Sequence, residues 1–214
     1  MIGGVFEDRE QAGRELAAAL TERVEGPATV LAIPRGGVVV AEPVAETLGA
    51  PLDVVIPRKL GAPGNPELAI GAVAPGGVLV LHERAVRQLR VPEAYIQREA
   101  ERQEEEIVRR EAAYRGGRPP APVAGRTVVV VDDGVATGAT AVAALRWVRA
   151  AGAARVVFAA PVGPPAARAR LGPEADEVIL LEEPRMFFAV GEWYRDFDQV
   201  SDDQVIDTLR RHGG

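Results

Sequence analysis

Two adjacent carboxylates, Asp132 and Asp133, follow four consecutive valines at residues 128–131. Carboxylates accept hydrogen bonds from sugar hydroxyls and bind hydrated Mg²⁺. The loop after them consists of Gly134, Val135, Ala136, Thr137, Gly138, Ala139 and Thr140. Its small residues let a ligand approach the backbone, and the helix predicted next would present free amides that attract phosphate. Acids suited to a diol beside a phosphate cradle predict a ribose phosphate as the ligand.

Cationic side chains follow two other predicted strands. Arg35 lies in the segment Pro34-Arg35-Gly36-Gly37, where a strand gives way to a helix and two glycines permit close approach of a ligand. Arg58 and Lys59 follow the strand predicted at residues 52–57. Lys59 is the one lysine in a chain that otherwise uses arginine. Because the two side chains are not equivalent at a tight phosphate site, we interpret Lys59 as functional rather than as a chance survivor.

The apolar pattern predicts a parallel sheet that brings these groups together. Strands are expected at residues 28–33, 52–57, 127–132, 154–160 and 177–181, and helices at 7–24, 37–49, 138–151 and 165–171. This alternation is typical of a doubly wound, mainly parallel α/β fold. The carboxyl ends of parallel strands share one edge, so Arg35, Lys59 and the loop at residues 132–140 are expected to converge there.

Two segments fall outside this alternation. Residues 60–118 are predicted to form a helical insertion, with short strands at 68–74 and 77–82 and a long charged helix at 92–114. The thin apolar stripe of that helix suits a solvated surface or a contact within a homo-oligomer. Residues from about 184 to 214 are expected to form a small C-terminal hood, helical from about 202 to 211. We interpret residues 1–214 as a single domain.

The motif at residues 128–140 resembles the binding signature of type I phosphoribosyltransferases: a hydrophobic strand, two acids, small residues, Thr-Gly and a further Thr. Residues 33–37 are similar to the pyrophosphate loop of the same family, and the likeness covers residues 28–181. The resemblance implies that Arg35, Gly36 and Gly37 contact the diphosphate of phosphoribosyl pyrophosphate. In several members of the family the corresponding peptide bond is cis, and the sequence leaves open which isomer Pro34–Arg35 adopts. The chain looks similar to a group of predicted phosphoribosyltransferases of unassigned substrate.

The same resemblance assigns roles to the other candidates. Asp132 and Asp133 would bind the ribose hydroxyls, with Mg²⁺ held mainly through the substrate and no dedicated metal site in the protein. The implied reaction transfers the phosphoribosyl group to a nitrogenous base and releases pyrophosphate, with catalysis by positioning and fixed charge. The catalytic residues would be Asp132, Asp133, Arg35 and Lys59, and the substrate-binding residues Pro34, Gly36, Gly37, Arg58, Ala136, Thr137, Gly138, Ala139 and Thr140.

The aromatic segment at residues 187–197 has two interpretations. Phe188, Trp193 and Tyr194 are candidates to stack on the base, as terminal segments do in family members, or to close the edge of the core.

Two departures from the family pattern narrow the range of possible substrates. Many members that act on 6-oxopurines carry an acid where this chain has Ala136, which disfavours ordinary hypoxanthine–guanine salvage. The long hood loop of orotate-type members is not evident.

Composition limits the partners. The 214-residue chain has a net charge of −6, which disfavours nucleic acid, and no apolar run approaches the roughly 20 residues that span a bilayer. The chain has no cysteine, so disulfides and thiolate metal sites are excluded. Its first residues lack the layout of a signal peptide, so a cytoplasmic location is expected.

Two other functional classes stay open. A non-enzymatic sensor of phosphoribosyl pyrophosphate or of a nucleotide is favoured by the missing acid at Ala136. A Mg²⁺-dependent phosphohydrolase or receiver-like domain would use the Asp132–Asp133 pair. That class requires a phosphorylatable aspartate at another strand end, and the sequence offers no convincing one.

Overall fold

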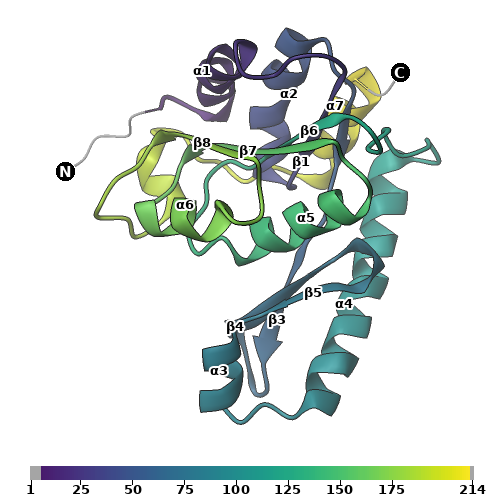
Figure 1. Ribbon diagram of the computed structural model, residues 1–214, viewed down its shortest axis with the longest axis vertical. Coiled ribbons are helices and arrows are strands. Elements are labelled where there is room, and N and C mark those ends of the chain that lie inside the picture. Colours follow the sequence, from purple (N-terminus) through teal and green to yellow (C-terminus); the bar gives the residue numbers. More distant parts are fainter. Residues whose placement is uncertain (1–5, 213–214) are drawn as a thin grey trace.

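The computed structural model describes residues 6–212, and its centre is a sheet of five parallel strands in the order β2-β1-β6-β7-β8. The strands are β1 (Ala28–Ala32), β2 (Leu52–Val54), β6 (Thr127–Val131), β7 (Arg155–Val162) and β8 (Glu177–Glu182). The helices around them are α1 (Arg9–Thr21), α2 (Gly36–Leu48), α5 (Ala139–Ala150), α6 (Pro165–Leu171) and α7 (Asp202–His212). Helices α1 and α2 cover one face and α5 and α6 the other (Figure 1). This confirms the doubly wound α/β fold.

The valine run of β6 fills both layers of the core. Val129 and Val131 pack in the cluster that contains Leu16 of α1 and Val38 of α2. Val128 and Val130 face the opposite way and pack with α5. All four valines are fully buried. Because alternate side chains of a strand point to opposite faces, a strand covered by helices on both sides is apolar at every position.

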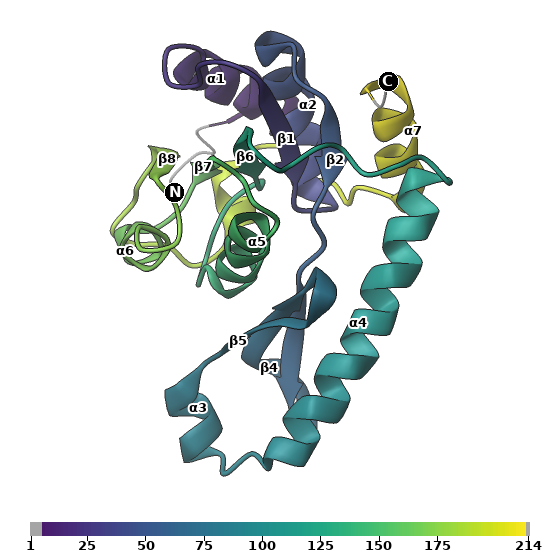
Figure 2. The same cartoon turned by 45° about the vertical axis from the view of Figure 1, so that its right-hand side comes forward.

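Residues 58–115 leave this core and return to it (Figure 2). They form an antiparallel sheet of β3 (Arg58–Ala62), β4 (Asn65–Ala74) and β5 (Val78–Leu81), followed by α3 (Glu83–Gln88) and the long helix α4 (Glu93–Arg115). Apolar residues of this sheet, including Ala72 and Val80, pack in one cluster with Val142 of α5. The antiparallel sheet therefore rests on the same helix that follows the two aspartates.

The structure corrects the sequence-based prediction at the start of this segment. The strand predicted at residues 52–57 ends at Val54, and Arg58 and Lys59 begin β3 in the second sheet. Strand β3 was missed because its glycines and the prolines around it are typical of a turn. A Cβ atom on Gly61 would lie 2.6 Å from the backbone of Pro66, so glycine is what allows β3 and β4 to pass so closely.

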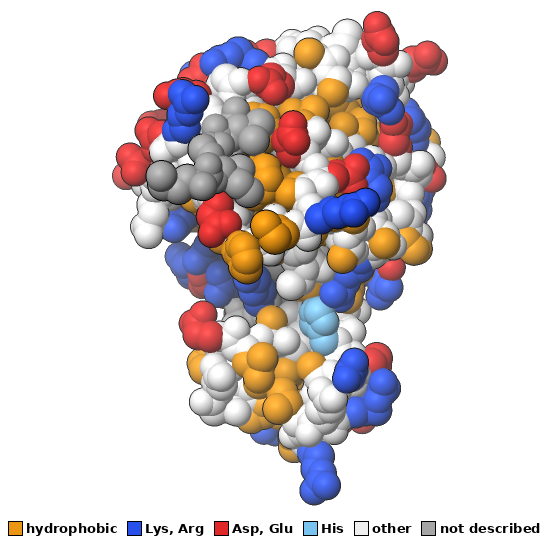
Figure 3. All heavy atoms as spheres, turned by 90° about the vertical axis from the view of Figure 1, so that its left-hand side faces the viewer, with side chains coloured by type: hydrophobic (Ala, Val, Ile, Leu, Met, Phe, Trp, Pro, Cys, Tyr) orange, Lys and Arg blue, Asp and Glu red, His pale blue; other side chains and the backbone are white. Residues whose placement is uncertain are grey.

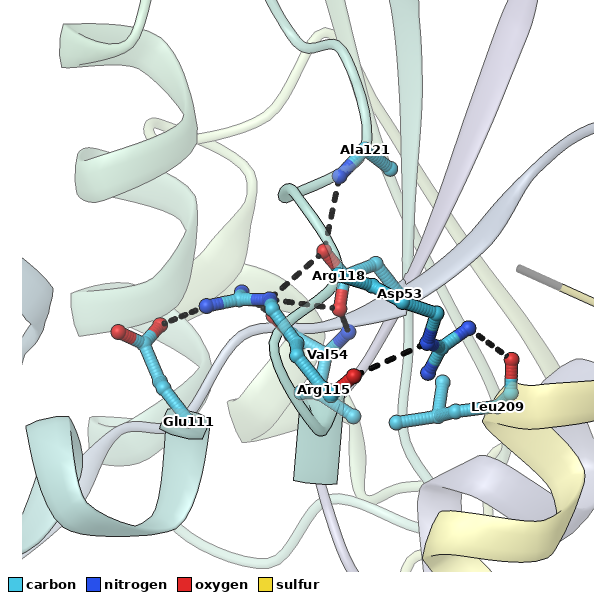
Figure 4. A network of polar contacts seen from close by, with 7 residues as sticks. All are labelled: Asp53, Val54, Glu111, Arg115, Arg118, Ala121 and Leu209. Carbon is cyan, nitrogen blue, oxygen red and sulfur yellow. Dashed lines mark hydrogen bonds and ion pairs between the residues drawn. The ribbon is translucent and has the colours of Figure 1, made fainter. Parts of the chain in front are cut away.

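A buried polar network ties the end of α4 to the parallel sheet (Figure 4). Asp53 of β2 accepts hydrogen bonds from Nε of Arg115 at 3.0 and 3.1 Å and from the amide of Ala121 at 2.9 Å. Arg118 donates to the carbonyl oxygens of Arg115 and Leu209. The network fixes where α4 leaves the core, and so it sets the position of the second sheet.

Among the described residues, no helix is both long enough and apolar enough to cross a membrane.

Candidate active site

A cleft of about 530 Å³ lies between the carboxyl edge of the parallel sheet and the second sheet with α4. Figure 3 shows the two lobes of the molecule joined at a waist where basic side chains gather. The cleft is lined by Ile33, Pro34, Pro57, Arg58, Lys59, Gly61, Pro66, Glu67, Glu99, Arg102, Gln103, Asp132 and Thr140. Candidate residues from all three predicted motifs thus border one space.

The two aspartates at the end of β6 differ in their surroundings. Asp132 lines the cleft, and its Oδ1 accepts the amide of Asp133 at 2.9 Å. Asp133 is bound from outside the motif by Arg9 of α1, with 2.8 Å between Nε and Oδ2. The side chains of Arg9 and Asp133 are 11% and 16% exposed. Two carboxylates are thereby held side by side, one of them compensated by an arginine that the motif does not contain.

Burial governs the charge of this pair. Burial and the neighbouring Asp133 raise the pKa of Asp132 well above its usual range. Burial also raises the pKa of Asp133, although Arg9 opposes that shift. Repulsion between the carboxylates is relieved by a cation or by hydroxyl donors. The pair therefore fits either the hydroxyls of a sugar or a divalent ion such as Mg²⁺.

Glycines bring α2 against these acids. A Cβ on Gly36 would lie 1.8 Å from Oδ2 of Asp133, and a Cβ on Gly37 would lie 2.9 Å from the carbonyl oxygen of Val131. No residue other than glycine fits either position without displacing its neighbours. The peptide bond between Pro34 and Arg35, whose isomer the sequence left open, is cis. Pro34 lines the cleft.

The amino-terminal ends of two helices lie at this edge, and within residues 6–212 neither has a capping side chain. Helix α5 follows Gly138, which has a φ of +75°, and α2 follows Arg35. First-turn amides without partners attract phosphate oxygens. Ala136 and Thr137 are exposed, Gly138 and Ala139 are buried, and Thr140 lines the cleft.

Arg35 lies differently from the other cationic candidates. Its side chain is 41% exposed and is not among those lining the cleft; Nη1 lies 3.6 Å from Oδ1 of Asp202 at the start of α7. Tyr114 of α4 donates to the same carboxylate at 2.6 Å, and this hydrogen bond lowers the pKa of Asp202. In this structure the Arg35 side chain thus contacts α7 rather than Asp132.

The far wall of the cleft was not foreseen from the sequence. Gln103 of α4 is buried, and it accepts from Nε of Arg58 at 2.8 Å and donates to Glu99 at 2.9 Å. Arg102 pairs with Glu99 at 2.7 Å. The sequence signal was present, because a polar residue such as Gln103 falls on the thin apolar face of the helix, but only the fold shows what that face meets.

The aromatic tail divides between core and surface. Trp193 and Tyr194 are buried with Phe6, and the Tyr194 hydroxyl donates to the carbonyl oxygen of Asp133 at 2.5 Å. Phe188 is 82% exposed. Of the two interpretations offered for this segment, the buried packing of Trp193 and Tyr194 corresponds to closure of the core.

Outside the cleft, the described residues hold one cluster with the composition of a metal site. Glu42 and Glu46 of α2 lie near His212, and the three ligand atoms are within 4.8 Å of one another. Glu42 is already paired with Arg211 at 2.7 Å. The carboxylate pair at Asp132 and Asp133 remains the better candidate, because it shares its edge with the phosphate-binding features.

The protein family follows from a comparison with family models. The model of the phosphoribosyl transferase domain matches residues 6–196. The chain belongs to this family. The protein TT1426 from Thermus thermophilus has a solved structure that is 50% identical, covers 98% of this chain and 99% of its own, and superposes with a TM-score of 0.81.

Other relatives share the family or the fold. A Mycobacterium tuberculosis protein, named only provisionally as a phosphoribosyl transferase, is 48% identical over 97% of this chain and 47% of its own length. The chain therefore spans about half the length of that relative. A hypothetical protein from Neisseria gonorrhoeae, solved with bound ppGpp, is 16% identical with a TM-score of 0.53 and covers 99% of this chain and 98% of its own. At that identity the likeness concerns the fold alone.

Proposed function

We propose that the protein binds phosphoribosyl pyrophosphate with Mg²⁺ and transfers its phosphoribosyl group to a nitrogenous base, releasing pyrophosphate. The observation that carries this proposal is the cleft that Asp132, Thr140 and Lys59 line together. A carboxylate, a hydroxyl beside a helix amino end and a compact ammonium correspond to ribose, 5′-phosphate and diphosphate. Membership of the phosphoribosyl transferase family supports the same reaction class.

Different residues bind different parts of the substrate. Asp132 and Asp133 hold the ribose hydroxyls, and the amides and hydroxyls of residues 136–140 hold the 5′-phosphate. Lys59, Arg58 and the amides of Gly36 and Gly37 face the diphosphate. Pro34 shapes that end of the cleft. The Arg35 side chain reaches the diphosphate only if it leaves Asp202, which lies 3.6 Å away.

Chemistry at C1 of the ribose requires little covalent help from the protein. The bond to pyrophosphate breaks as a nitrogen of the base forms the new bond, and charge accumulates on the leaving group. Cationic side chains fixed beside that group stabilise it before the reaction begins. Mg²⁺, held through the substrate and by the Asp132 and Asp133 carboxylates, would neutralise the diphosphate. These oxygens are the hard ligands that this ion prefers.

Pyrophosphate release tests the proposal. The protein is incubated with phosphoribosyl pyrophosphate, Mg²⁺ and each of a panel of purines, pyrimidines and simpler amines, and liberated pyrophosphate is measured. We expect release with at least one acceptor and none from Asp132→Asn. Binding of phosphoribosyl pyrophosphate without turnover on any acceptor would contradict transfer.

A sensor of phosphoribosyl pyrophosphate or of a nucleotide is the second candidate. Ala136 is exposed, and its methyl group cannot exchange a proton with an acceptor. A protein that binds the sugar phosphate tightly but lacks this group could report its concentration. The turnover assay separates the two functions. The phosphohydrolase alternative, the cytoplasmic location and a homo-oligomer stay predictions of the sequence.

A further inference from the structure

Arg9 lies far from the sequence motifs, yet it contacts Asp133 of the site and two residues of the C-terminal tail. Its Nε donates to Oδ2 of Asp133 at 2.8 Å, and its Nη1 donates to the carbonyl oxygen of Asp198 at 2.8 Å. The guanidinium carbon lies 3.7 Å from the ring centroid of Phe197. A planar group fixed by two hydrogen bonds and one aromatic face has little freedom to turn.

The tail also holds the backbone of the same aspartate. The Tyr194 hydroxyl donates to the Asp133 carbonyl oxygen at 2.5 Å. The Tyr194 ring packs on Phe6, with 5.5 Å between centroids, and on Phe197, with 5.1 Å. Side chain and main chain of Asp133 are therefore both held by segments that are distant in sequence.

We propose that Arg9 is a positioning residue, which fixes Oδ2 of Asp133 so that Oδ1 faces a ribose hydroxyl. The inference rests on the proposed function, because it takes Asp133 as a ribose ligand. Phe197 and Tyr194 then have a role other than stacking on a base. Phe197 holds the Arg9 guanidinium in place, and Tyr194 holds the backbone of Asp133. Fixing a carboxylate before the sugar arrives lowers the entropy lost on binding.

The alternative is that Arg9 competes with the sugar for Asp133 and blocks its binding. Arg9 engages Oδ2, and Gly36 lies against that same oxygen, since a Cβ there would be 1.8 Å away. One side of the carboxylate is thus closed by α1 and α2. Neither contact engages Oδ1, the oxygen that we assign to the ribose, which favours positioning over blockage.

Discrimination among sugars is the readout that separates positioning from general stability. Calorimetric titrations compare ribose 5-phosphate with its 2-deoxy and 3-deoxy analogues, using the wild type, Arg9→Gln and Arg14→Gln. Arg14 is the matched control, because it lies on the same helix but pairs with Glu10 on the surface, where its side chain is 56% exposed. We expect Arg9→Gln to weaken ribose 5-phosphate binding about tenfold and to bring at least one deoxy analogue level with it. Arg14→Gln should match the wild type.

A second variant guards against loss of folding. Phe197→Leu leaves Arg9 in place and removes the ring beneath it, and it should reduce the preference for ribose by a smaller factor. Wild-type preference for ribose in folded Arg9→Gln, or in Phe197→Leu where Arg9→Gln does not fold, would overturn the inference. Tighter ribose binding by Arg9→Gln would overturn it too, because Arg9 would then be an obstacle. If the wild type binds ribose 5-phosphate and both deoxy analogues equally well, the proposed function is overturned, and the inference with it.

Discussion

Replacing Gly36 with alanine tests the geometry of the aspartate pair most directly. The added methyl group would lie 1.8 Å from Oδ2 and 2.6 Å from Cγ of Asp133, and 2.8 Å from Nε of Arg9. Backbone fixes the methyl group, so the carboxylate must move by about 1 Å or more. A displacement of that size at a reacting centre costs on the order of 100-fold in rate.

The loss in affinity follows from the hydrogen bonds. A bond to a charged group contributes about 1.5–3 kcal/mol, and each 1.4 kcal/mol is a factor of about ten in affinity. Gly36→Ala should therefore weaken ribose 5-phosphate binding about 10- to 100-fold in a calorimetric titration. Gly172→Ala is the control, because its methyl group would meet nothing nearer than 3.4 Å and its φ is −50°. Wild-type affinity in Gly36→Ala would refute the assignment of Asp133 to the ligand.

Three further predictions concern the buried Asp53–Arg115 pair, the charge of Asp132 and the proposed diphosphate contact of Lys59. Asp53→Ala should cost about 3 kcal/mol in denaturant unfolding, because the buried Arg115 loses its closest carboxylate and, among the described residues, keeps only Glu111 at 3.3 Å. Glu7→Ala at the exposed pair with Arg195 should cost no more than about 1 kcal/mol. Asp132→Asn should raise the melting temperature at pH 7, because burial and Asp133 raise the pKa of Asp132 and its charged form therefore destabilises the folded protein. The gain should vanish as the pH falls toward about 3.9, where the carboxyl is protonated in the folded protein and begins to be protonated in the unfolded chain. Lys59→Gln should weaken phosphoribosyl pyrophosphate binding at least about tenfold while ribose 5-phosphate binding stays unchanged in the same titration.

Local patterns predicted the parallel sheet because each of its strands carries its own signal. The valines of β6 are buried by helices on both faces, so their run could be interpreted without knowledge of partners. Strand β3 gave no such signal. Its glycines serve a close crossing with β4 that only the paired strands reveal. Lys59 was consequently expected just after a strand of the parallel sheet, whereas it lies in β3 and lines the cleft with Asp132.

Contacts between distant segments were the other gap. Arg9 and Asp133 are separated by 124 positions, and Arg58 and Gln103 by 45. Arginines are common on helices, so Arg9 could not be told apart from the others by type or spacing. The position of Gln103 on the apolar face of α4 was visible in the sequence, but its partner Arg58 was not. Tyr194 was singled out as an aromatic residue, but its hydroxyl contact with the Asp133 backbone depends on how the tail returns to β6.

The segment from Arg58 to Arg115 leaves the parallel sheet after β2 and rejoins it before β6, so one unbroken stretch of the gene encodes an entire wall of the cleft. Mutation can remodel that wall without touching Asp132 or the loop that follows it. The cationic side chains of that wall, Arg58 and Lys59, can then change separately from the aspartate pair. Exchanging this stretch between relatives would replace one wall of the cleft and leave the aspartate pair in place.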